Sequence, residues 1–437
     1  MPKFIITTLG CKVNQYESET IAAALEKSGW TDEAQSAAGA EVCIINTCAV
    51  TRKAAMQSRQ AVRQALKAHP GARILVTGCY AQTDPDALKK IAGISCVLGH
   101  AAKHAIPDML TSPPDSPGPL AAVGFKPAAA PPFREPALTV PKSRTRPFLK
   151  IQDGCDAFCS YCIVPYARGR SCSMPFENVM ENIRRLARAG FHEVVLCGVH
   201  LGCYGQDLDP PASLFAVLRQ VDSDRPIDRL RLSSIEPREI SEDIINLTAA
   251  SKQLCHHFHI PLQSGDDTIL ERMKRPYSRS FFRELVLKIR AAMPDAAIGA
   301  DVLIGFPGET EAAFQNTVDL IEELPLTYLH VFPFSARKGT PADTFTGKVP
   351  AQVIKSRCHS LRQIGAAIKK DFYRRFIGRT LPVLIEGRRD ASGMLKGFTA
   401  NYLPVGLSGG DNLKNTIVPV RIESIEKDLT LRGTLSE

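Results

Sequence analysis

The sequence predicts an α/β fold class with a doubly wound N-terminal domain, a partial β/α (TIM-like) barrel and a small C-terminal all-β barrel. Three observations lead to this prediction. Short apolar segments alternate with helix-like segments across residues 1–106, and they do so again across residues 148–376. A Pro- and Ala-rich stretch, residues 107–147, separates these two series. In residues 377–437 the alternation gives way to short strands, and a chain of 437 residues allows about three domains.

The apolar runs of the N-terminal domain are short and continuous, which is typical of a parallel sheet covered by helices on both faces. Strands are expected at residues 3–9, 41–47, 72–77 and 94–98. Helices are expected between them at residues 17–28, 51–67 and 84–91. This alternation predicts a doubly wound domain.

The second series contains six strand-like segments with helical segments between them. The strands are expected at residues 148–152, 193–199, 229–233, 257–262, 297–304 and 328–332. The helices are expected at residues 176–189, 214–221, 241–249, 280–293 and 311–324. Such repeats predict an incomplete β/α barrel, whose functional groups lie at the carboxyl ends of the strands.

The two remaining segments differ in composition from these series. Residues 107–147 hold eleven prolines and show little periodicity, so we expect an extended linker that acts as a tether. Short strands separated by Gly, Asp and Asn are expected at residues 380–385, 396–407, 415–425 and 429–435. These strands predict a small β-barrel, similar in size to an OB-fold.

The composition narrows the class of protein. Hydrophobic residues make up 44% and charged residues 23%, which excludes a disordered or collagen-like chain. No apolar run approaches the ~18 residues of a membrane helix, and the first nine residues do not resemble a secretory signal, so we expect a cytoplasmic protein without a membrane partner. Clustered cysteines in such a chain favour metal binding over disulfides. A net charge of +9 suits a polyanionic partner.

The strongest local motif is a group of three cysteines, Cys155, Cys159 and Cys162. Three thiolates are one ligand short of a tetrahedral zinc site, so a zinc knuckle with a distant fourth ligand is one interpretation. The other is a 4Fe-4S cluster in which one iron has no protein ligand and can bind a substrate or cofactor.

A second group of cysteines is dispersed in the N-terminal domain. Cys11, Cys48 and Cys79 each follow a predicted strand, and the carboxyl ends of parallel strands meet at one edge of a sheet. Gly10 and Gly78 would let the backbone turn closely around a bulky centre. We therefore expect a second three-cysteine site there. Small buried apolar roles are expected for the remaining cysteines, Cys43, Cys96, Cys172, Cys197, Cys203, Cys255 and Cys358.

We call Cys155, Cys159 and Cys162 the barrel cysteines, and the segment that contains them the barrel motif. This motif, with Tyr161 before its last cysteine, resembles the signature of the radical S-adenosylmethionine (SAM) superfamily. Together with the second cysteine group and the C-terminal barrel, it makes almost the whole chain resemble the radical SAM methylthiotransferases. The motifs that carry this resemblance are TLGCKVNQYE at 8–17, INTCAVT at 45–51, CSYCIVPYARG at 159–169, GVHLG at 198–202, HIPLQSG at 259–265 and GFPGE at 305–309.

The resemblance implies two 4Fe-4S clusters, one held by Cys11, Cys48 and Cys79 and one by the barrel cysteines. It implies that the open iron of the barrel cluster binds SAM, which one electron cleaves to a 5′-deoxyadenosyl radical. It also implies that the N-terminal cluster carries or delivers sulfur, and that the C-terminal barrel is an RNA-binding TRAM domain.

Candidate cofactor-binding residues include Tyr161 and four others. Gly198 closes a barrel strand and can bring its backbone close to the SAM amine. Glu236 could accept hydrogen bonds from the SAM ribose, although acids are also favoured at helix starts. Asp301 is a lone carboxylate in an apolar strand, which suggests a polar role inside the barrel. Arg168 could pair with the SAM carboxylate or an RNA phosphate, or simply be solvated.

Within the family, the segment 11–16 most resembles the branch that methylthiolates carbon 2 of threonylcarbamoyl-adenosine 37 in tRNA. The alternatives are modification of isopentenyl-adenosine 37, modification of a ribosomal protein aspartate, and a non-catalytic, zinc-binding RNA adaptor. Basic tracts at 49–73 and 351–379 suit a tRNA partner. The other expected partners are a sulfur source and an electron donor such as flavodoxin or ferredoxin.

Overall fold

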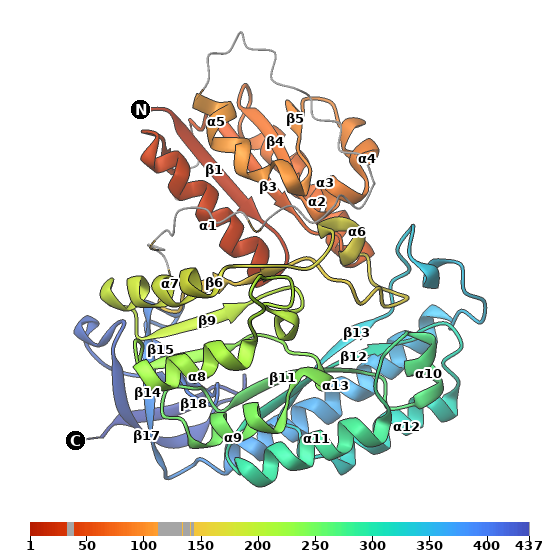
Figure 1. Ribbon diagram of the computed structural model, residues 1–437, viewed down its shortest axis with the longest axis vertical. Coiled ribbons are helices and arrows are strands. Elements are labelled where there is room, and N and C mark those ends of the chain that lie inside the picture. Colours follow the sequence, from red (N-terminus) through yellow and green to blue (C-terminus); the bar gives the residue numbers. More distant parts are fainter. Residues whose placement is uncertain (33–38, 112–132, 134–139, 141–143, 437) are drawn as a thin grey trace.

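The computed structural model describes residues 1–32, 39–111, 133, 140 and 144–436. Its first unit is a five-stranded, fully parallel sheet of order β2-β1-β3-β4-β5, seen at the top of Figure 1. The strands are β1 (Lys3–Thr8), β2 (Thr31–Asp32), β3 (Val42–Thr47), β4 (Arg73–Gly78) and β5 (Cys96–Val97). The helices are α1 (Lys12–Lys27), α2 (Arg52–Ala68), α3 (Cys79–Thr83), α4 (Pro85–Lys89), η1 (His100–Ala105) and α5 (Ile106–Thr111).

The alternation of side chains along β3 and β4 explains why helices cover both faces of this sheet. Ile44 and Leu75 pack on one face with residues of α1 and α5. Ile45 and Val76 pack on the other face with residues of α2 and α4. The sheet is therefore doubly wound, as the short continuous apolar runs predicted.

Three details of this unit differ from the prediction. Helix α1 begins at Lys12, immediately after Cys11, and not at residue 17. The helix predicted over 84–91 is the shorter α4, and it is separated from α3 at Pro85, because proline cannot continue the ladder of backbone hydrogen bonds. Helix α5 occupies the first residues of the segment predicted as a linker, and most of that segment lies outside the described residues.

The second unit is an open barrel of six parallel strands that alternate with helices. The strands are β6 (Phe148–Lys150), β9 (Glu193–Cys197), β10 (Arg229–Leu232), β11 (His257–Gln263), β12 (Ala297–Ile304) and β13 (Tyr328–Pro333). They form sheets of order β10-β9-β6 and β11-β12-β13, which parallel bridges join between β10 and β11. Within the described residues, β6 and β13 are the two edge strands, each paired on one side alone, and they do not pair with each other. This arrangement confirms the predicted partial barrel.

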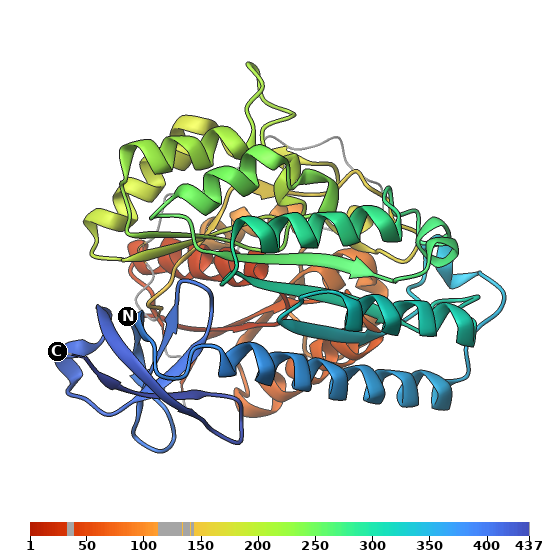
Figure 2. The ribbon, with the colours of Figure 1, turned by 90° about the horizontal axis from the view of Figure 1, so that it is seen from below.

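Helices cover the outside of this barrel (Figures 1 and 2). They are α7 (Phe176–Arg188), α8 (Leu214–Asp224), α9 (Glu242–Ala250), α10 (Asp267–Arg272), α11 (Arg279–Ala292) and α12 (Glu311–Glu323). Short elements follow the first strand, namely β7 (Gln152–Asp153), α6 (Val164–Arg168) and β8 (Cys172–Ser173). One large apolar core fills the space between the strands and these helices. Among the described residues, no helix is long and apolar enough to cross a membrane.

The C-terminal unit is a closed barrel of order β14-β15-β16-β18-β17. Its strands are β14 (Thr380–Arg389), β15 (Leu395–Thr399), β16 (Pro404–Leu407), β17 (Ile417–Ile425) and β18 (Leu431–Leu435). The long helix α13 (Ala351–Arg374) runs beside the open barrel and leads into the closed C-terminal barrel, as Figure 2 shows. The strand predicted over 396–407 is in fact two strands, because the chain turns at Tyr402, whose φ is +66°.

Candidate metal centres and active-site pocket

The three dispersed cysteines of the N-terminal unit come together at one edge of its sheet. Cys11 follows β1, Cys48 follows β3 and Cys79 follows β4, and these three strands are neighbours. Burial raises the pKa of Cys48 to about 11, and the nearby thiols of Cys79 and Cys11 add to the shift. Burial also raises the pKa of Cys79, again with a contribution from Cys11. The structure thus brings together the group that the strand ends predicted.

Glycine is required at two turns of this edge. Gly10 has a φ of +103°, and a Cβ there would lie 3.0 Å from the Cys48 sulfur. Gly78 has a φ of +97°, and a Cβ there would lie 2.4 Å from the Thr47 carbonyl oxygen. Both backbone angles favour glycine, and any side chain would collide with the neighbouring strand end.

The barrel cysteines lie in the single loop between β7 and α6. Cys159 is buried, whereas Cys155 and Cys162 are half-buried. Burial raises the pKa of Cys162 to about 12, with further contributions from Cys159 and Cys155. The guanidinium of Arg275 donates to the Cys159 sulfur at 3.3 Å. Sequence reasoning missed Arg275, which precedes Pro276 in a loop without any cysteine pattern.

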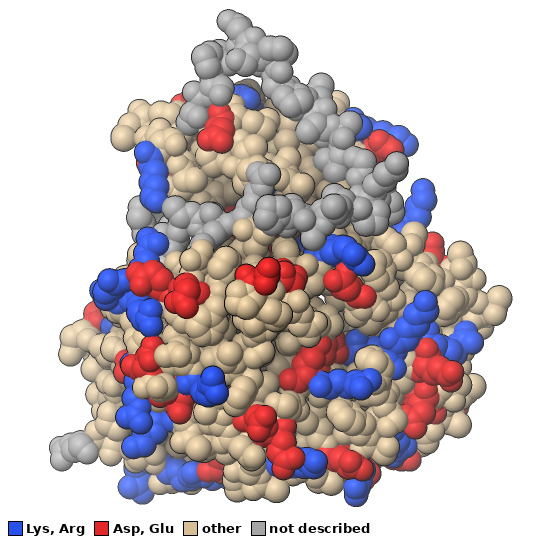
Figure 3. All heavy atoms as spheres, viewed as in Figure 1, with Lys and Arg blue, Asp and Glu red and all other residues tan. Residues whose placement is uncertain are grey.

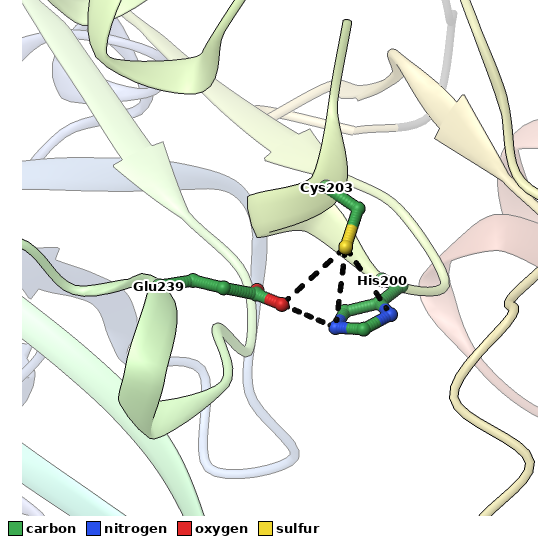
Figure 4. Close-up of side chains that lie close together, drawn as sticks. All are labelled: His200, Cys203 and Glu239. Carbon is green, nitrogen blue, oxygen red and sulfur yellow. Dashed lines mark hydrogen bonds and ion pairs between the residues drawn. The ribbon is translucent and has the colours of Figure 1, made fainter. Parts of the chain in front are cut away.

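Three side chains, His200, Cys203 and Glu239, converge in one cluster, as Figure 4 shows. His200 follows β9, and its Nδ1 lies 3.4 Å from the Cys155 sulfur. The sulfur of Cys203 lies 3.6 Å from both ring nitrogens of His200 and 3.5 Å from a carboxylate oxygen of Glu239. Glu239 also forms an ion pair with His200.

Burial alone would lower the pKa of His200, but the contacts with Cys155, Cys203 and Glu239 raise it. The small buried role predicted for Cys203 is wrong, because this thiol is half-buried in a polar cluster. Cys172 is likewise half-buried, whereas the prediction of burial is correct for Cys43, Cys96, Cys197, Cys255 and Cys358.

The predicted carboxylate Glu236 lies close to the barrel cysteines. It forms an ion pair with Arg275, the residue that also contacts Cys159. Tyr161 lies in the same neighbourhood. Burial raises its pKa, and the charge of Arg275 is the main influence that opposes this rise. Gly198 ends β9, and a Cβ there would lie 2.9 Å from the side-chain oxygen of Gln152. Glu236 and Tyr161 therefore lie beside the barrel cysteines, and Gly198 lies beside Gln152, three residues before Cys155.

Arg168 does not lie where either a SAM carboxylate or an RNA phosphate could reach it. Its side chain is 1% exposed, and it donates to Glu17 at 2.9 Å, to Asp153 at 2.8 Å and to Asn14 at 2.5 Å. Its guanidinium is therefore occupied between α1 and the barrel, which corrects the predicted cofactor role. Burial raises the pKa of Cys79 and the charge of Arg168 opposes that rise, so this charge acts near the N-terminal cysteines.

A cavity of about 810 Å³ lies where the three units meet. Cys11 and Cys48 line it from the N-terminal unit, Asp301 from the open barrel, and Arg388 and Tyr402 from the C-terminal barrel. Its volume is within the range of ligand pockets, ~300–1,000 Å³. Both the N-terminal cysteine site and the barrel strands therefore face a single pocket.

Asp301 contributes to a hydrogen-bonded chain on the wall of this pocket. Its Oδ1 lies 2.8 Å from Nε2 of His259 and 3.2 Å from Nδ1 of His330. Tyr328 extends the chain, with its hydroxyl 3.0 Å from Nδ1 of His259 and 2.8 Å from Nε2 of His257. Burial favours the neutral acid, but the two hydrogen bonds outweigh it and lower the pKa of Asp301.

An open β/α barrel with a Cys-x3-Cys-x2-Cys loop beside its first strand defines the radical SAM class. In agreement, residues 149–321 match the radical SAM superfamily. Residues 3–99 match a family described as uncharacterized protein family UPF0004.

Two curated relatives are called threonylcarbamoyladenosine tRNA methylthiotransferase MtaB. The protein of Bacillus subtilis is 36% identical over 95% of this chain and 92% of its own length. The protein of Rickettsia prowazekii is 39% identical over 92% of this chain and 90% of its own length. A tRNA-2-methylthio-N(6)-dimethylallyladenosine synthase of Pelotomaculum thermopropionicum is 32% identical over 97% of this chain and 95% of its own.

A solved structure supports the fold. The radical SAM methyltransferase TsrM of Kitasatospora setae, with cobalamin and a [4Fe-4S] cluster bound, aligns with a TM-score of 0.57 over 78% of this chain and 77% of that one, at 16% identity. The chain belongs to the radical SAM tRNA methylthiotransferases, a family of transferases.

The cofactors of this family, iron–sulfur clusters and SAM, fit the residues present. Each cysteine group provides three thiols near one another, and burial raises the pKa of Cys48 and Cys162. Such thiols keep their protons until a cation displaces them, which is how metal binding is coupled to deprotonation. Three cysteines leave one iron of a cubane cluster without a protein ligand.

Proposed function

We propose that this enzyme inserts a methylthio group at carbon 2 of N6-threonylcarbamoyladenosine 37 in tRNA. The observation that carries the proposal is the shared cavity, in which Cys11 and Cys48 face the strands of the open barrel. The names of the relatives support this substrate, because the MtaB proteins reach 34–39% identity and the dimethylallyladenosine synthases 30–32%. The enzyme relatives also favour this function over a non-catalytic adaptor.

The two cysteine groups receive different roles in this proposal. Cys155, Cys159 and Cys162 would hold the 4Fe-4S cluster with an open iron, and Cys11, Cys48 and Cys79 would hold the second cluster. When bound, the first cluster and SAM supply the radical that removes hydrogen from an unreactive C–H bond.

The chain itself holds these groups in place. Arg275 would keep Cys159 oriented and His200 would do so for Cys155, through the contacts at 3.3 and 3.4 Å. Glu236 and Gly198 would lie beside the bound SAM. Asp301, in contrast, is engaged with His259 and His330 on the pocket wall, so we assign it to the side of the RNA substrate.

The basic tracts predicted to bind tRNA are partly neutralised by acids. In α13 and the segment that follows it, Arg357 pairs with Glu309, Arg374 with Asp371 and Arg375 with Asp295. On the face shown in Figure 3, basic and acidic side chains are interspersed. Some α13 cations, among them exposed Lys370, have no acidic partner in the part of the chain that the structure describes, and they are therefore the better candidates for phosphate contacts.

The experiment that tests the substrate uses enzyme with reconstituted clusters, SAM and a reductant. It would receive tRNA carrying threonylcarbamoyl-adenosine, isopentenyl-adenosine or plain adenosine at position 37, and nucleoside mass spectrometry would detect methylthiolation. We expect product only from the first tRNA. Equal activity on the isopentenyl tRNA, or activity only on a ribosomal protein aspartate, would overturn the proposal.

Three further expectations depend on this function. Turnover needs an electron donor, for which a flavodoxin or ferredoxin is suitable, and it needs a source of sulfur. With a tRNA substrate, we also expect the enzyme to act in the cytoplasm.

The division of the chain into four parts, with boundaries after residues 106, 147 and 376, stays a prediction.

A further inference from the structure

We propose that Tyr328, His330 and Phe332 form a stacking surface that receives the target adenine base in the shared cavity. This inference rests on the proposed function, because it requires a single-stranded RNA loop as substrate. The three residues lie two positions apart on the edge strand β13, and all three line the cavity. Alternate residues of a strand share one face, so the strand presents a stripe of aromatic rings.

Tyr328 is half-buried, but the other two rings of this stripe are exposed, which sets them apart from the aromatic residues of the core. Phe332 is 44% exposed and the side chain of His330 is 54% exposed, whereas Val331 between them is buried. The ring centroids lie 5.3 Å apart for Tyr328 and His330, and 6.3 Å apart for His330 and Phe332. Unstacked RNA bases are commonly bound on exposed aromatic or histidine rings of this kind.

Two of the three rings, Tyr328 and His330, are held in place before any ligand binds. Asp301 accepts a hydrogen bond from Nδ1 of His330 at 3.2 Å, and Nε2 of His259 lies 2.8 Å from the same carboxylate oxygen. His259 in turn contacts the Tyr328 hydroxyl at 3.0 Å. Because the rings are already oriented, binding loses little side-chain entropy.

The charge around the cavity is complementary to a nucleotide. Lys12 and Arg388 line it from opposite units, and within the described residues neither forms an ion pair. Arg146, in contrast, pairs with Glu386 at 2.8 Å. Two unpaired cations suit anionic oxygens, whether of backbone phosphates or of the threonyl carboxylate. A base on β13 would thus share the cavity with Cys11 and Cys48.

The test is a double-mutant cycle between one ring and one base. Binding of the reconstituted holoenzyme to an anticodon stem-loop would be measured anaerobically by fluorescence anisotropy. One RNA carries threonylcarbamoyl-adenosine at position 37, a second carries the methyl ester of its carboxylate, and a third is abasic at that position. The proteins are wild type, Phe332→Ala, Phe332→Tyr and Phe281→Ala, the last removing a Phe that is 39% exposed on α11 and is absent from the cavity lining.

Stacking of one base contributes ~1–3 kcal/mol, which corresponds to a factor of at least about five in affinity. Wild type, Phe332→Tyr and Phe281→Ala should therefore bind the modified RNA at least about fivefold more tightly than the abasic RNA. Phe332→Ala should reduce that difference by about fivefold or more, because it loses the stacking contribution. Arg388→Ala is a further variant in this test. If it abolishes a preference for the free carboxylate over the ester, this cation is assigned to the carboxylate. If it keeps the preference and weakens the binding of all three RNAs, the cation is assigned to phosphate.

If Phe332→Ala weakens the modified and abasic RNAs by the same factor, or weakens neither, the stacking surface is disproved. These outcomes are distinct from a failure of the proposed function, which would appear as absence of methylthiolated product from wild-type enzyme on intact tRNA. Phe332→Tyr separates loss of the ring from loss of folding, because it keeps an aromatic ring at this exposed position.

Discussion

The two cysteine sites differ in how the chain builds them. The barrel site is a single loop of eight residues, Cys155 to Cys162, so its ligands are close whatever the rest of the barrel does. The N-terminal site joins three strand ends, and it exists only because β1, β3 and β4 pair in parallel register, with Thr8 opposite Asn46 and Thr47 opposite Gly78. The first site depends on local sequence, and the second depends on the packing of a whole domain.

The largest effects should come from removing the cysteines themselves. Any of Cys155→Ala, Cys159→Ala or Cys162→Ala should abolish both SAM cleavage and methylthiolation, because the cluster that binds SAM cannot assemble. Cys48→Ala should keep SAM cleavage, measured as 5′-deoxyadenosine, while losing methylthiolation and about half of the bound iron. Cys358→Ala, at a buried cysteine outside both sites, is the control. Full methylthiolation by Cys48→Ala would contradict the assignment.

The next largest effect should come from the charges that link the two sites. Glu17, on α1, pairs with Arg168 at 2.9 Å, with Lys150 at 3.2 Å and with Lys103. Glu17→Gln would leave buried cations without their carboxylate, which costs ~3–5 kcal/mol and roughly 6–15 °C in apparent Tm. Glu181→Gln, in an exposed pair with Arg188, should cost at most about 1 kcal/mol. Thermal unfolding of the two variants measures the contrast.

The pH dependence of this effect follows from the pKa of Glu17. Burial would raise that pKa, but Arg168, Lys103 and Lys150 outweigh it and hold it well below the usual value. A carboxylate with a lowered pKa stabilises the fold fully above its unfolded value, ~4.3, and loses that stabilisation as the pH falls through the folded value. The Tm difference between wild type and Glu17→Gln should therefore be constant from pH 6 to 8. A difference that changes steeply in this range would refute the ion-pair explanation.

The same contrast explains what the sequence could predict. The barrel motif is visible in the spacing of Cys155, Cys159 and Cys162, and the N-terminal site follows once each strand has been located. The apolar runs located those strands within a few residues, which was enough to place Cys11 and Cys79 at strand ends. The grouping of the barrel cysteines could therefore be predicted from their spacing, and that of Cys11, Cys48 and Cys79 from the rule that parallel strands end at one edge of a sheet.

The residues that sequence reasoning missed or misplaced depend on tertiary contacts between loops. His200, Cys203 and Glu239 come from short turns after β9 and β10, and no spacing rule brings such turns together. A signal for His200 did exist, because it lies in the motif at 198–202. Arg168 was misplaced because a lone arginine gives no sign of the burial that Glu17 and Asp153 impose on it.

A smaller effect should distinguish steric fit from backbone strain at the N-terminal site. Gly10 and Gly29 both have positive φ, +103° and +85°, but a Cβ at Gly10 would lie 3.0 Å from the Cys48 sulfur, while one at Gly29 has nothing within 4 Å. Both alanine variants should lose ~1–2 kcal/mol of stability from the left-handed backbone. Only Gly10→Ala should also lower the iron bound at the N-terminal site. Equal iron loss in both would show that the sulfur contact is unimportant.

The smallest effect should come from a change that leaves both cysteine sites intact. Lys370 is an exposed cation of α13 with no ion pair among the described residues, whereas Arg374 pairs with Asp371 at 2.7 Å. A cation that contacts RNA phosphate releases a counterion, and each such contact adds ~0.7–0.9 to the slope of log affinity against log salt. Lys370→Ala should lower the slope for tRNA binding by about that amount, and Arg374→Ala by less, because Asp371 already neutralises it. Cleavage of SAM without tRNA should be unchanged in both variants. Binding titrations at several salt concentrations measure which variant loses more of the salt slope. A larger loss of slope for Arg374→Ala would show that the Arg374–Asp371 ion pair breaks when the RNA binds.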